Sequence, residues 1–395
     1  MVVETQKEEL GVRNQNTVLG GLLKAVSRKQ FGRIVSRHEG DRYVKDFSSW
    51  DHLVTLIFAQ LGGLSSLREL ATVWNAQAAH HYHLGSRPVR RSTLSDANAR
   101  RPSGIFAELF AQLSAAANRS LRREGQEVLR LLDATPIPLS SLHDWACCNG
   151  RTRGLKAHLS YDPEADRPVR LEITPATVND VVVGRAQPIE PGATYVYDKA
   201  YVDYGWWHRL HQAGCRFVTR PKTNVPFTVV KERRVGKRMR QASIVRDTLV
   251  RLASQQRPRL PILLRRIVLR RDNGRFLSIL TNDLRSSAST IAALYRKRWQ
   301  IELLFRWIKQ HLKIRTFLGR SENAIRLQLY AAMIAYLLLR IAARNSRSAL
   351  PALRFAELVR TRLFECRPVE RIDKPSKPLL PAYLKTPNQL VFSYA

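Results

Sequence analysis

The chain has 395 residues, 44% of them hydrophobic, so it can bury one full-sized core and one or two smaller modules. Its formal net charge is +34, from 66 Lys and Arg against 32 Asp and Glu, which predicts a polyanionic partner, with nucleic acid as the first choice. This composition argues against a disordered chain, and four cysteines without a Cys-x-x-Cys pair argue against a disulfide scaffold or structural zinc.

No secretory or membrane segment is expected. The N-terminus lacks the basic patch and apolar stretch of a secretory signal. The longest apolar run, residues 329–339, falls short of the ~20 residues that span a bilayer and is predicted as a buried helix. We therefore expect a cytoplasmic, nucleoid-associated protein that makes no membrane contact.

Residues 1–120 are predicted to form a helical N-terminal DNA-binding domain. Arg90 and Arg91 precede one of its helices and are candidate DNA-binding residues. Short helices joined by tight turns, with a basic entrance, resemble a helix-turn-helix arrangement, although a helical packing domain with a solvated basic face fits the same pattern equally well. The start signals are the capping patterns Ser48-x-x-Asp51, Ser66-x-x-Glu69 and Thr93-x-x-Asp96.

From about residue 127 the period changes to that of short buried strands. The run 128–133 is apolar and ends in a carboxylate. The predicted order is three strands, a helix, a strand, a helix and a strand, which is ribonuclease H-like. It predicts an α/β (α+β) fold with a mixed-sheet catalytic core. The first part of this core is residues 121–222. The further strands are expected at 155–161, 169–174, 194–198 and 215–220, and the helices at 178–185 and 204–213.

A basic segment then interrupts the core. Residues 220–275 hold 17 Lys and Arg against three acidic residues, and strand-like pieces at 227–230 and 260–269 predict a β-rich insertion, 223–283. The second part of the core, 284–345, begins with a long helix from about 289 to 312, followed by an apolar helix at 324–342; a C-terminal helix and tail occupy 346–395. The candidate DNA-binding residues of the insertion are Arg233, Arg234, Lys237, Arg238 and Arg240.

Two aspartates close apolar strands. Asp133 ends the first strand and Asp198 the fourth, and these two strands can lie side by side in such a sheet. Breaking a phosphodiester needs an activated nucleophile and a stabilised leaving oxygen, which two metal ions about 3.5–4 Å apart supply, and hard cations such as Mg²⁺ prefer carboxylate oxygens. An aspartate at a strand end is also a common solvated turn residue.

A third carboxylate lies on the long helix. At 100° per residue, Tyr295, Arg298, Glu302 and Lys309 share one narrow stripe. A helix face stabilised by ion pairs between its side chains would explain the same stripe without a catalytic role.

Other candidates for the same chemistry are weaker. Asp162, Asp180 and Asp203 lie near predicted strand ends or turns, and any of them would replace one of the three carboxylates if the strand order were different. His158 could position a water, although a hydrogen-bonded core histidine is the better explanation. We expect the following tryptophans in the core rather than as platforms for a flipped base: Trp206, Trp207, Trp299 and Trp307.

The spacing Tyr295-x-x-Arg298-x-x-x-Glu302-x-x-x-x-x-x-Lys309 resembles the Tyr-Arg-Glu-Lys signature of the DDE transposases of the fourth bacterial insertion-sequence family. The resemblance covers about 127–340, including Leu132-Asp133 and Tyr197-Asp198, and the helical region more loosely. It implies that Asp133, Asp198 and Glu302 are catalytic ligands of two Mg²⁺ ions, for which Mn²⁺ may substitute. It further implies that Arg298 and Lys309 contact phosphate near the cleaved bond and that Tyr295 braces the DNA backbone.

These features predict a DNA transposase. The helical domain and the insertion would bind inverted-repeat ends of an insertion sequence, the acidic centre would nick one strand, and the freed 3′-hydroxyl would attack target DNA, as in cut-and-paste transposition. Holding both ends implies a homodimer on double-stranded DNA, with salt-dependent binding. Two alternatives stay open, a ribonuclease H-like DNA nuclease without strand transfer and a DNA-binding regulator with idle carboxylates.

Overall fold

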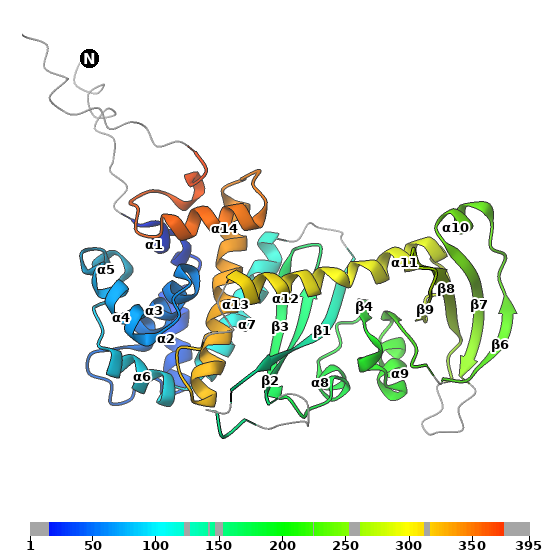
Figure 1. Ribbon diagram of the computed structural model, residues 1–395, viewed down its shortest axis with the longest axis horizontal. Coiled ribbons are helices and arrows are strands. Elements are labelled where there is room, and N and C mark those ends of the chain that lie inside the picture. Colours follow the sequence, from blue (N-terminus) through cyan, green and yellow to red (C-terminus); the bar gives the residue numbers. More distant parts are fainter. Residues whose placement is uncertain are drawn as a thin grey trace, which may run out of the picture.

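The computed structural model describes residues 16–121, 127–140, 143–146, 153–223, 225–252, 261–311 and 317–374. A helical region lies at one end of the molecule and a nine-stranded mixed sheet extends from it to the other end (Figure 1). The long helix α13 (Glu322–Asn345) stands between the two. The prediction of a mixed α/β fold with a helical N-terminal region is confirmed.

Seven helices build the described part of the N-terminal region. Two of the capping patterns are confirmed, because Ser48 and Asp51 form a capping box at α3 and Ser66 caps α4. The helices are α1 (Val18–Leu23), α2 (Arg28–Arg37), α3 (Ser49–Gly62), α4 (Leu67–Asn75), α5 (Ala78–Leu84), α6 (Arg91–Arg100) and α7 (Gly104–Leu121).

The start signal at Thr93 is wrong, because α6 begins two residues earlier, at Arg91. The side chain of Asn75 explains the difference: its amide donates to the carbonyl of Val89 at 2.9 Å and its oxygen accepts from the Val89 N–H at 2.8 Å. These bonds hold the chain extended up to Arg90, so the helix starts directly after it. A contact between distant residues, and not a local cap, fixes this boundary.

Helix α13 is a core helix. It is 24 residues long with a mean hydropathy of 1.5 in its most apolar window, and by length and composition alone it would cross a membrane, but 83% of that window is buried inside the protein. Helices α3, α7 and α14 and strand β3 pack around it. The predicted buried helix is confirmed, and no membrane span is indicated.

The C-terminal segment returns to the N-terminal helices. It contains α14 (Ala352–Thr361) and η2 (Val369–Arg371). The N–H groups of Val18 and Leu19 in α1 donate to backbone carbonyls of this segment at 3.0 and 2.9 Å. Segments from both ends of the described chain therefore build one helical region. The predicted tail beyond Lys374 lies outside the described residues.

The sheet has the order β3-β2-β1-β4-β5-β9-β8-β7-β6. Strands β1, β4 and β5 run parallel, and all other neighbours are antiparallel. Helices α8 (Asp180–Ala186) and α9 (Tyr204–Gln212) follow β3 and β4, as expected. The first five strands are β1 (Leu129–Pro138), β2 (Gly154–Asp162), β3 (Arg167–Pro175), β4 (Thr194–Tyr197) and β5 (Arg216–Thr219). The expectation that Asp133 ends the first strand is wrong, because β1 continues beyond it to Pro138 through its pairing with β2, and only its ladder with β4 stops at Leu132.

The basic segment continues the same sheet. Its strand β9 pairs with β5 on one side and β8 on the other, so the insertion is joined to the core through backbone hydrogen bonds. Strand β7 was not predicted, because charged residues interrupt its apolar pattern; one of them, Asp247, is buried in an ion pair with Arg265. The elements are β6 (Phe227–Glu232), α10 (Lys237–Gln241), β7 (Ile244–Leu252), β8 (Leu264–Arg270) and β9 (Phe276–Thr281).

The long helix predicted from about 289 to 312 is two helices, α11 (Ala288–Lys297) and α12 (Trp299–His311). At the junction the Arg298 N–H donates to the carbonyl of Tyr295 at 3.2 Å, so the hydrogen bond spans three residues instead of four. Arg298 keeps helical backbone angles, and the two helices form one nearly continuous rod along the sheet (Figure 1). We call α11 and α12 together the α11–α12 rod.

Candidate active site

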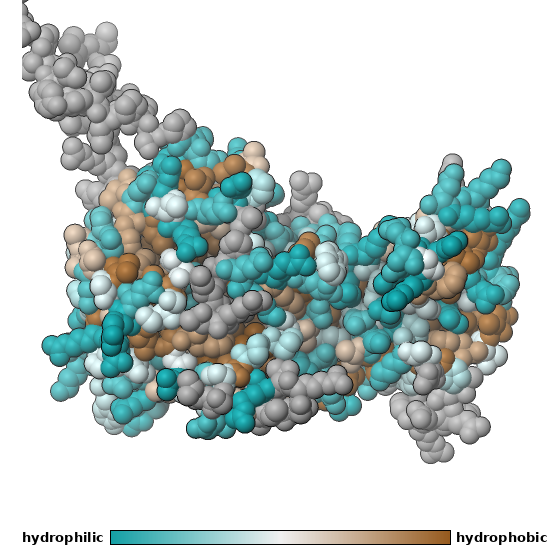
Figure 2. All heavy atoms as spheres, in the orientation of Figure 1, coloured by the Kyte–Doolittle hydropathy of each residue, from teal (hydrophilic) through white to brown (hydrophobic). Residues whose placement is uncertain are grey.

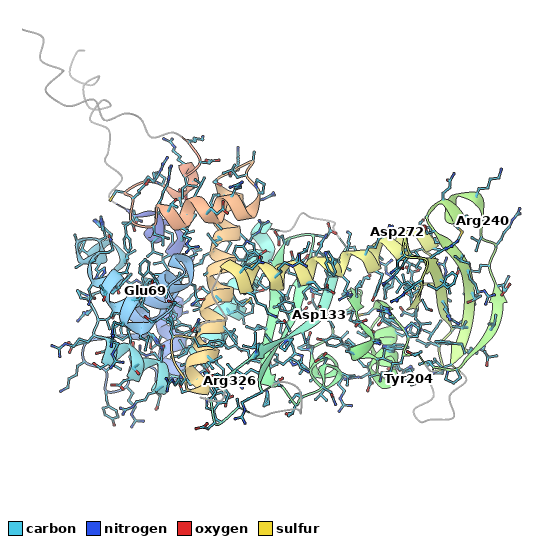
Figure 3. The ribbon with its side chains drawn as sticks, viewed as in Figure 1. Glu69, Asp133, Tyr204, Arg240, Asp272 and Arg326 are labelled. Atoms are coloured by element: carbon cyan, nitrogen blue, oxygen red, sulfur yellow. The ribbon has the colours of Figure 1, made fainter. Side chains whose placement is uncertain are left out.

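The register of β1 and β4 brings two aspartates side by side. Leu132 pairs with Tyr197 in the parallel ladder, and the residues that follow them are Asp133 and Asp198. Leu132 and Tyr197 belong to the apolar cluster on the α9 face. Because side chains alternate across a strand, Asp133 and Asp198 point to the opposite face, which the α11–α12 rod covers. Figure 3 labels Asp133 on β1 beneath this rod.

Arg298 links the first aspartate to Glu302. Its Nη1 lies 3.5 Å from Oδ2 of Asp133 and its Nη2 lies 2.5 Å from Oε1 of Glu302. The three side chains are between 17% and 28% exposed, so the cluster is largely buried but still reaches solvent. One guanidinium thus holds two carboxylates from different elements next to each other.

The electrostatics of Asp133 disfavour its charged form. Burial raises the pKa of Asp133 to about 6, and the negative charges of Glu302 and Asp198 act in the same direction, against the Ala134 N–H and Arg298. The Oδ1 atom of Asp198 is buried without a hydrogen-bond partner among the described residues. The cluster therefore offers carboxylate oxygens whose demand for positive charge is not met.

The other two residues of the stripe also face the core strands. Burial raises the pKa of Tyr295, whose ring centre lies 5.9 Å from Cζ of Arg298. The ammonium of Lys309 lies 2.5 Å from the hydroxyl oxygen of Thr135. Sequence reasoning missed Thr135, although its position two residues after Asp133 puts it on the same face of β1.

The arrangement is compatible with a hard divalent cation but does not form a closed metal site. Among the described residues, no three Asp, Glu, His or Cys side chains meet closely enough to hold a metal, and Arg298 lies between Asp133 and Glu302. The donors are all carboxylate oxygens from separate elements, the set that Mg²⁺ prefers. The unpartnered oxygen of Asp198 is the observation that fits a cation best.

The alternative acidic residues have structural partners. Asp162 is buried against Arg130, whose Nη1 lies 3.2 Å from its carboxylate. Asp180 pairs with Lys156 at 2.9 Å, and Asp203 caps α9 by accepting from a backbone N–H. These contacts account for all three carboxylates without chemistry.

The histidine and most tryptophans belong to the core. The Nε2 atom of His158 lies 2.9 Å from Oγ1 of Thr174, and burial lowers the pKa of His158 to about 4. Trp206 and Trp207 are buried, as expected. The expectation for Trp299 is wrong: it is 50% exposed, because it lies at the start of α12 and lines an open groove.

The predicted basic residues do not gather at the carboxylates. Arg233 donates to the carbonyl of Leu284 at 2.9 Å and so ties the insertion to the first residue of the second core part. Arg234, Lys237 and Arg240 are exposed, and Figure 3 labels Arg240 at the far end of the sheet from Asp133. The side chain of Arg238 lies outside those that the structure describes. Both residues of the pair Arg90 and Arg91 are exposed at the start of α6.

A groove adjoins the carboxylates between α11 and the turn from β8 to β9. Tyr295, Arg298 and Trp299 line one side of it. Figure 2 shows hydrophilic side chains along this part of the rod and over the edge of the insertion. Sequence reasoning missed its further arginines, because nothing in their local pattern separates them from other surface cations. These are Arg270, Arg271 and Arg296.

Comparisons with known proteins identify the family. The transposase DDE domain family matches residues 124–338, and a domain of unknown function, DUF4372, matches residues 14–87. A protein of Sinorhizobium fredii named as a transposase, y4zB, is 52% identical over 314 residues, which are 78% of this chain and 86% of that protein. A protein of Geobacillus stearothermophilus named as the transposase for insertion sequence element IS5377 is 29% identical over 83% of this chain and 85% of its own length.

Among solved structures, the piggyBac transposase in its synaptic complex with hairpin DNA aligns with 97% of this chain and 88% of that chain, at 11% identity and a TM-score of 0.47. This score is too low to carry an argument about fold or mechanism. The domain match covers more than half of the sequence, and the Sinorhizobium relative shares half of its residues over most of both chains. The chain belongs to the DDE transposases of insertion-sequence elements.

Proposed function

We propose that this transposase cuts and joins DNA phosphodiesters at Asp133, Asp198 and Glu302, on a ribonuclease H-like core. The observation that carries the proposal is the pairing of β1 with β4, which sets Asp133 beside Asp198 under the helix that bears Glu302. The unpartnered oxygen of Asp198 and the raised pKa of Asp133 support a cation as the missing partner.

The three carboxylates would hold two Mg²⁺ ions, or Mn²⁺ in their place. When bound, such ions activate an attacking water or 3′-hydroxyl and stabilise the leaving oxygen. Arg298 orients Asp133 and Glu302 through its two hydrogen-bonding arms, and it is the nearest cation for a phosphate oxygen at this cluster. Lys309 on α12 is held by its contact with Thr135 and adds a second positive charge next to β1, the strand that carries Asp133.

The proposed division of labour follows the chain. Residues 1–120 bind the inverted-repeat ends, the core parts 121–222 and 284–345 carry the chemistry, and the basic insertion 223–283 holds DNA beside them. Residues 346–395 complete the helical region. A net charge of +34 supports double-stranded DNA as the partner, both as element ends and as target. A homodimer on DNA would hold the two ends together in a cytoplasmic, nucleoid-associated complex.

The test uses the full chain with labelled inverted-repeat ends and a target plasmid in Mg²⁺ buffer. Cleaved ends joined to the plasmid would support cut-and-paste transposition. Cleavage without joining would favour the nuclease, and binding without cleavage the idle regulator. Asp198→Asn should abolish the products, whereas the control Asp46→Asn, an exposed carboxylate of the helical region, should keep them.

A further inference from the structure

A second groove lies away from the carboxylates, where the helical region meets the start of α13. Its walls come from the first turn of α4, from α6 and from the segment that leads into α13. Arg68, Arg91 and Arg320 line it, one from each wall. These residues are far apart in the chain, so no local sequence pattern announces the cluster.

The three arginines are not used by the fold. All three are exposed, and none of their side chains has an ion pair or hydrogen bond within the described residues. Among the residues that the structure describes, no acidic side chain lines the groove. This contrasts with Arg101 nearby, which is buried and donates to the carbonyls of Phe47 and Ser48. Three arginines around one hollow repel each other unless an anion joins them.

Asn98 gives an independent sign of a ligand at the floor of this groove. Only 3% of the residue is exposed, and its Oδ1 lies 2.8 Å from Nε2 of His52. The remaining amide NH₂ has no partner among the described residues, although the residue lines the groove. An unpartnered NH₂ at the wall of a basic hollow is a donor for an anionic oxygen. Gly319 lies beside this amide: a Cβ there would be in van der Waals contact with Nδ2 of Asn98 at 3.6 Å, and its close contact would be with Cβ of Ala324 at 2.6 Å.

Hydrogen bonds join two walls of the groove. The side-chain amide of Asn323 donates to the carbonyls of Asn98 and Arg101 at 2.9 and 2.7 Å, and its oxygen accepts from the Ser103 N–H at 3.2 Å. These bonds attach the first turn of α13 to the end of α6. Arg91 on α6 and Arg320 just before α13 therefore lie on two elements that are bonded to each other.

We propose that this groove binds the phosphate backbone of the element-end DNA where the duplex passes from the helical region to the core. The inference rests on the proposed DNA substrate and adds a contact site to it. Arg68, Arg91 and Arg320 each contact a phosphate oxygen, and the NH₂ of Asn98 donates to one of them. Contacts to phosphates position DNA without reading its sequence, so this site sets the placement of the duplex and leaves base recognition to other residues.

The experiment measures the affinity of the full chain for a labelled duplex carrying the element end, over a range of salt concentrations. Arg320→Gln and Arg91→Gln should each weaken binding about 5-fold and lower the slope of log affinity against log salt by about 1. Combined with Arg68→Gln, the loss should reach roughly 100-fold. Asn98→Asp keeps the oxygen facing His52 but sets a carboxylate near the phosphate, so it should weaken binding about 10-fold.

The matched control is Arg344→Gln, an exposed arginine at the opposite end of α13. It should leave affinity and slope unchanged, and thermal unfolding should be equal for the wild type and all arginine variants, whereas Asn98→Asp also places a carboxylate at a largely buried position and is compared only at temperatures where it is folded. If the slope of log affinity against log salt is unchanged in the triple variant, the proposal that the groove binds DNA is refuted, even if the wild type cleaves and joins DNA. A wild type that binds without cleaving would refute the proposed function instead, while the groove would still be judged by binding. If the arginine variants lose self-association but keep their DNA affinity, the groove contacts another protein chain, and the proposal that it binds DNA is likewise refuted.

Discussion

Two aspartate–arginine pairs lie on the same sheet and differ in how completely they are satisfied. In the insertion, Asp247 and Arg265 are both buried, two nitrogens of the guanidinium reach the two carboxylate oxygens at 2.8 and 2.7 Å, and a third donates to a backbone carbonyl. In the core, Arg298 reaches one oxygen of Asp133 at 3.5 Å and shares its charge with Glu302. We call the Asp247–Arg265 pair the closed pair, because its carboxylate oxygens and guanidinium nitrogens bond to each other, and the Asp133–Arg298–Glu302 group the open cluster, because its oxygens are incompletely bonded.

If the proposed function holds, this difference separates a pair that supports the fold from a cluster that takes part in the chemistry. A buried pair with every hydrogen bond made has nothing left to offer a ligand, and removing one partner leaves an unpaired charge. The open cluster keeps unpartnered oxygens and a carboxylate that resists ionisation, at a cost to stability that a bound cation would offset. Residues of identical type thus take different roles because of their surroundings.

The largest effect should come from the open cluster. Changing Asp133 or Asp198 to Asn removes a charged oxygen donor and should lower the rate of DNA cleavage by roughly 10³-fold or more. The unfolding free energy should stay equal or rise, because the repulsion between neighbouring carboxylates decreases. Cleavage assays and urea titrations of the same preparations check both parts. Retained cleavage in Asp198→Asn would remove this residue from the centre.

The closed pair should show the opposite response. Asp247→Ala leaves Arg265 buried without its partner and should cost about 3–5 kcal/mol of unfolding free energy. Replacing both residues by apolar ones, Asp247→Leu with Arg265→Met, should recover most of that loss. Urea unfolding measures the difference. A double variant as unstable as the single one would mean that the pair has a role beyond mutual satisfaction.

The raised pKa of Asp133 predicts a pH effect on stability. Its folded pKa is about 6 against an ordinary value of 3.8, so between these values the native state binds more protons than the unfolded state. Its contribution to stability is complete below pH ~3.8 and is lost as the pH rises through 6, by on the order of 2 kcal/mol. Unfolding in EDTA at pH 4.5 and 7.5 should show this loss in the wild type and not in Asp133→Asn.

Added Mg²⁺ sharpens the same measurement. At pH 7.5 it should raise the melting temperature of the wild type and leave that of Asp133→Asn nearly unchanged, because a ligand stabilises only the state that binds it. Equal shifts in both proteins would place the bound ion elsewhere.

The smallest effect concerns the second cation. Lys309→Gln should reduce cleavage about 10-fold through loss of a charge near the phosphate. Thr135→Val keeps the charge and removes only its hydrogen-bond partner, so it should cost about 3-fold. Single-turnover cleavage rates at saturating protein distinguish the two variants. A larger loss in Thr135→Val than in Lys309→Gln would argue against the charge as the cause.

Short-range patterns predicted much of this molecule. The apolar runs that end in Asp133 and Asp198 located β1 and β4, and the strand order indicated that the two would be neighbours. The helical period put Glu302 on the face with Arg298, and the break at Arg298 is small enough to preserve that face. Periodicity succeeded here because each element buries a continuous apolar side.

Other features depend on contacts between distant residues, which periodicity does not encode. Strand β7 escaped prediction because the partner that neutralises Asp247 lies on another strand. The start of α6 is set by Asn75, and the groove arginines Arg270 and Arg296 meet only in the folded chain. The sequence pattern predicted each of the three carboxylates separately, but it did not predict that Arg298 lies between Asp133 and Glu302.

The pairing of β5 with β9 has a mechanical consequence. Because the insertion and the core share one continuous ladder of backbone hydrogen bonds, the insertion cannot move away from the acidic residues without breaking that ladder. The distance between the outermost strand and the carboxylates is thereby restrained by the sheet. If the insertion holds DNA as proposed, this distance would act as a ruler that relates the held part of the duplex to the point of cleavage.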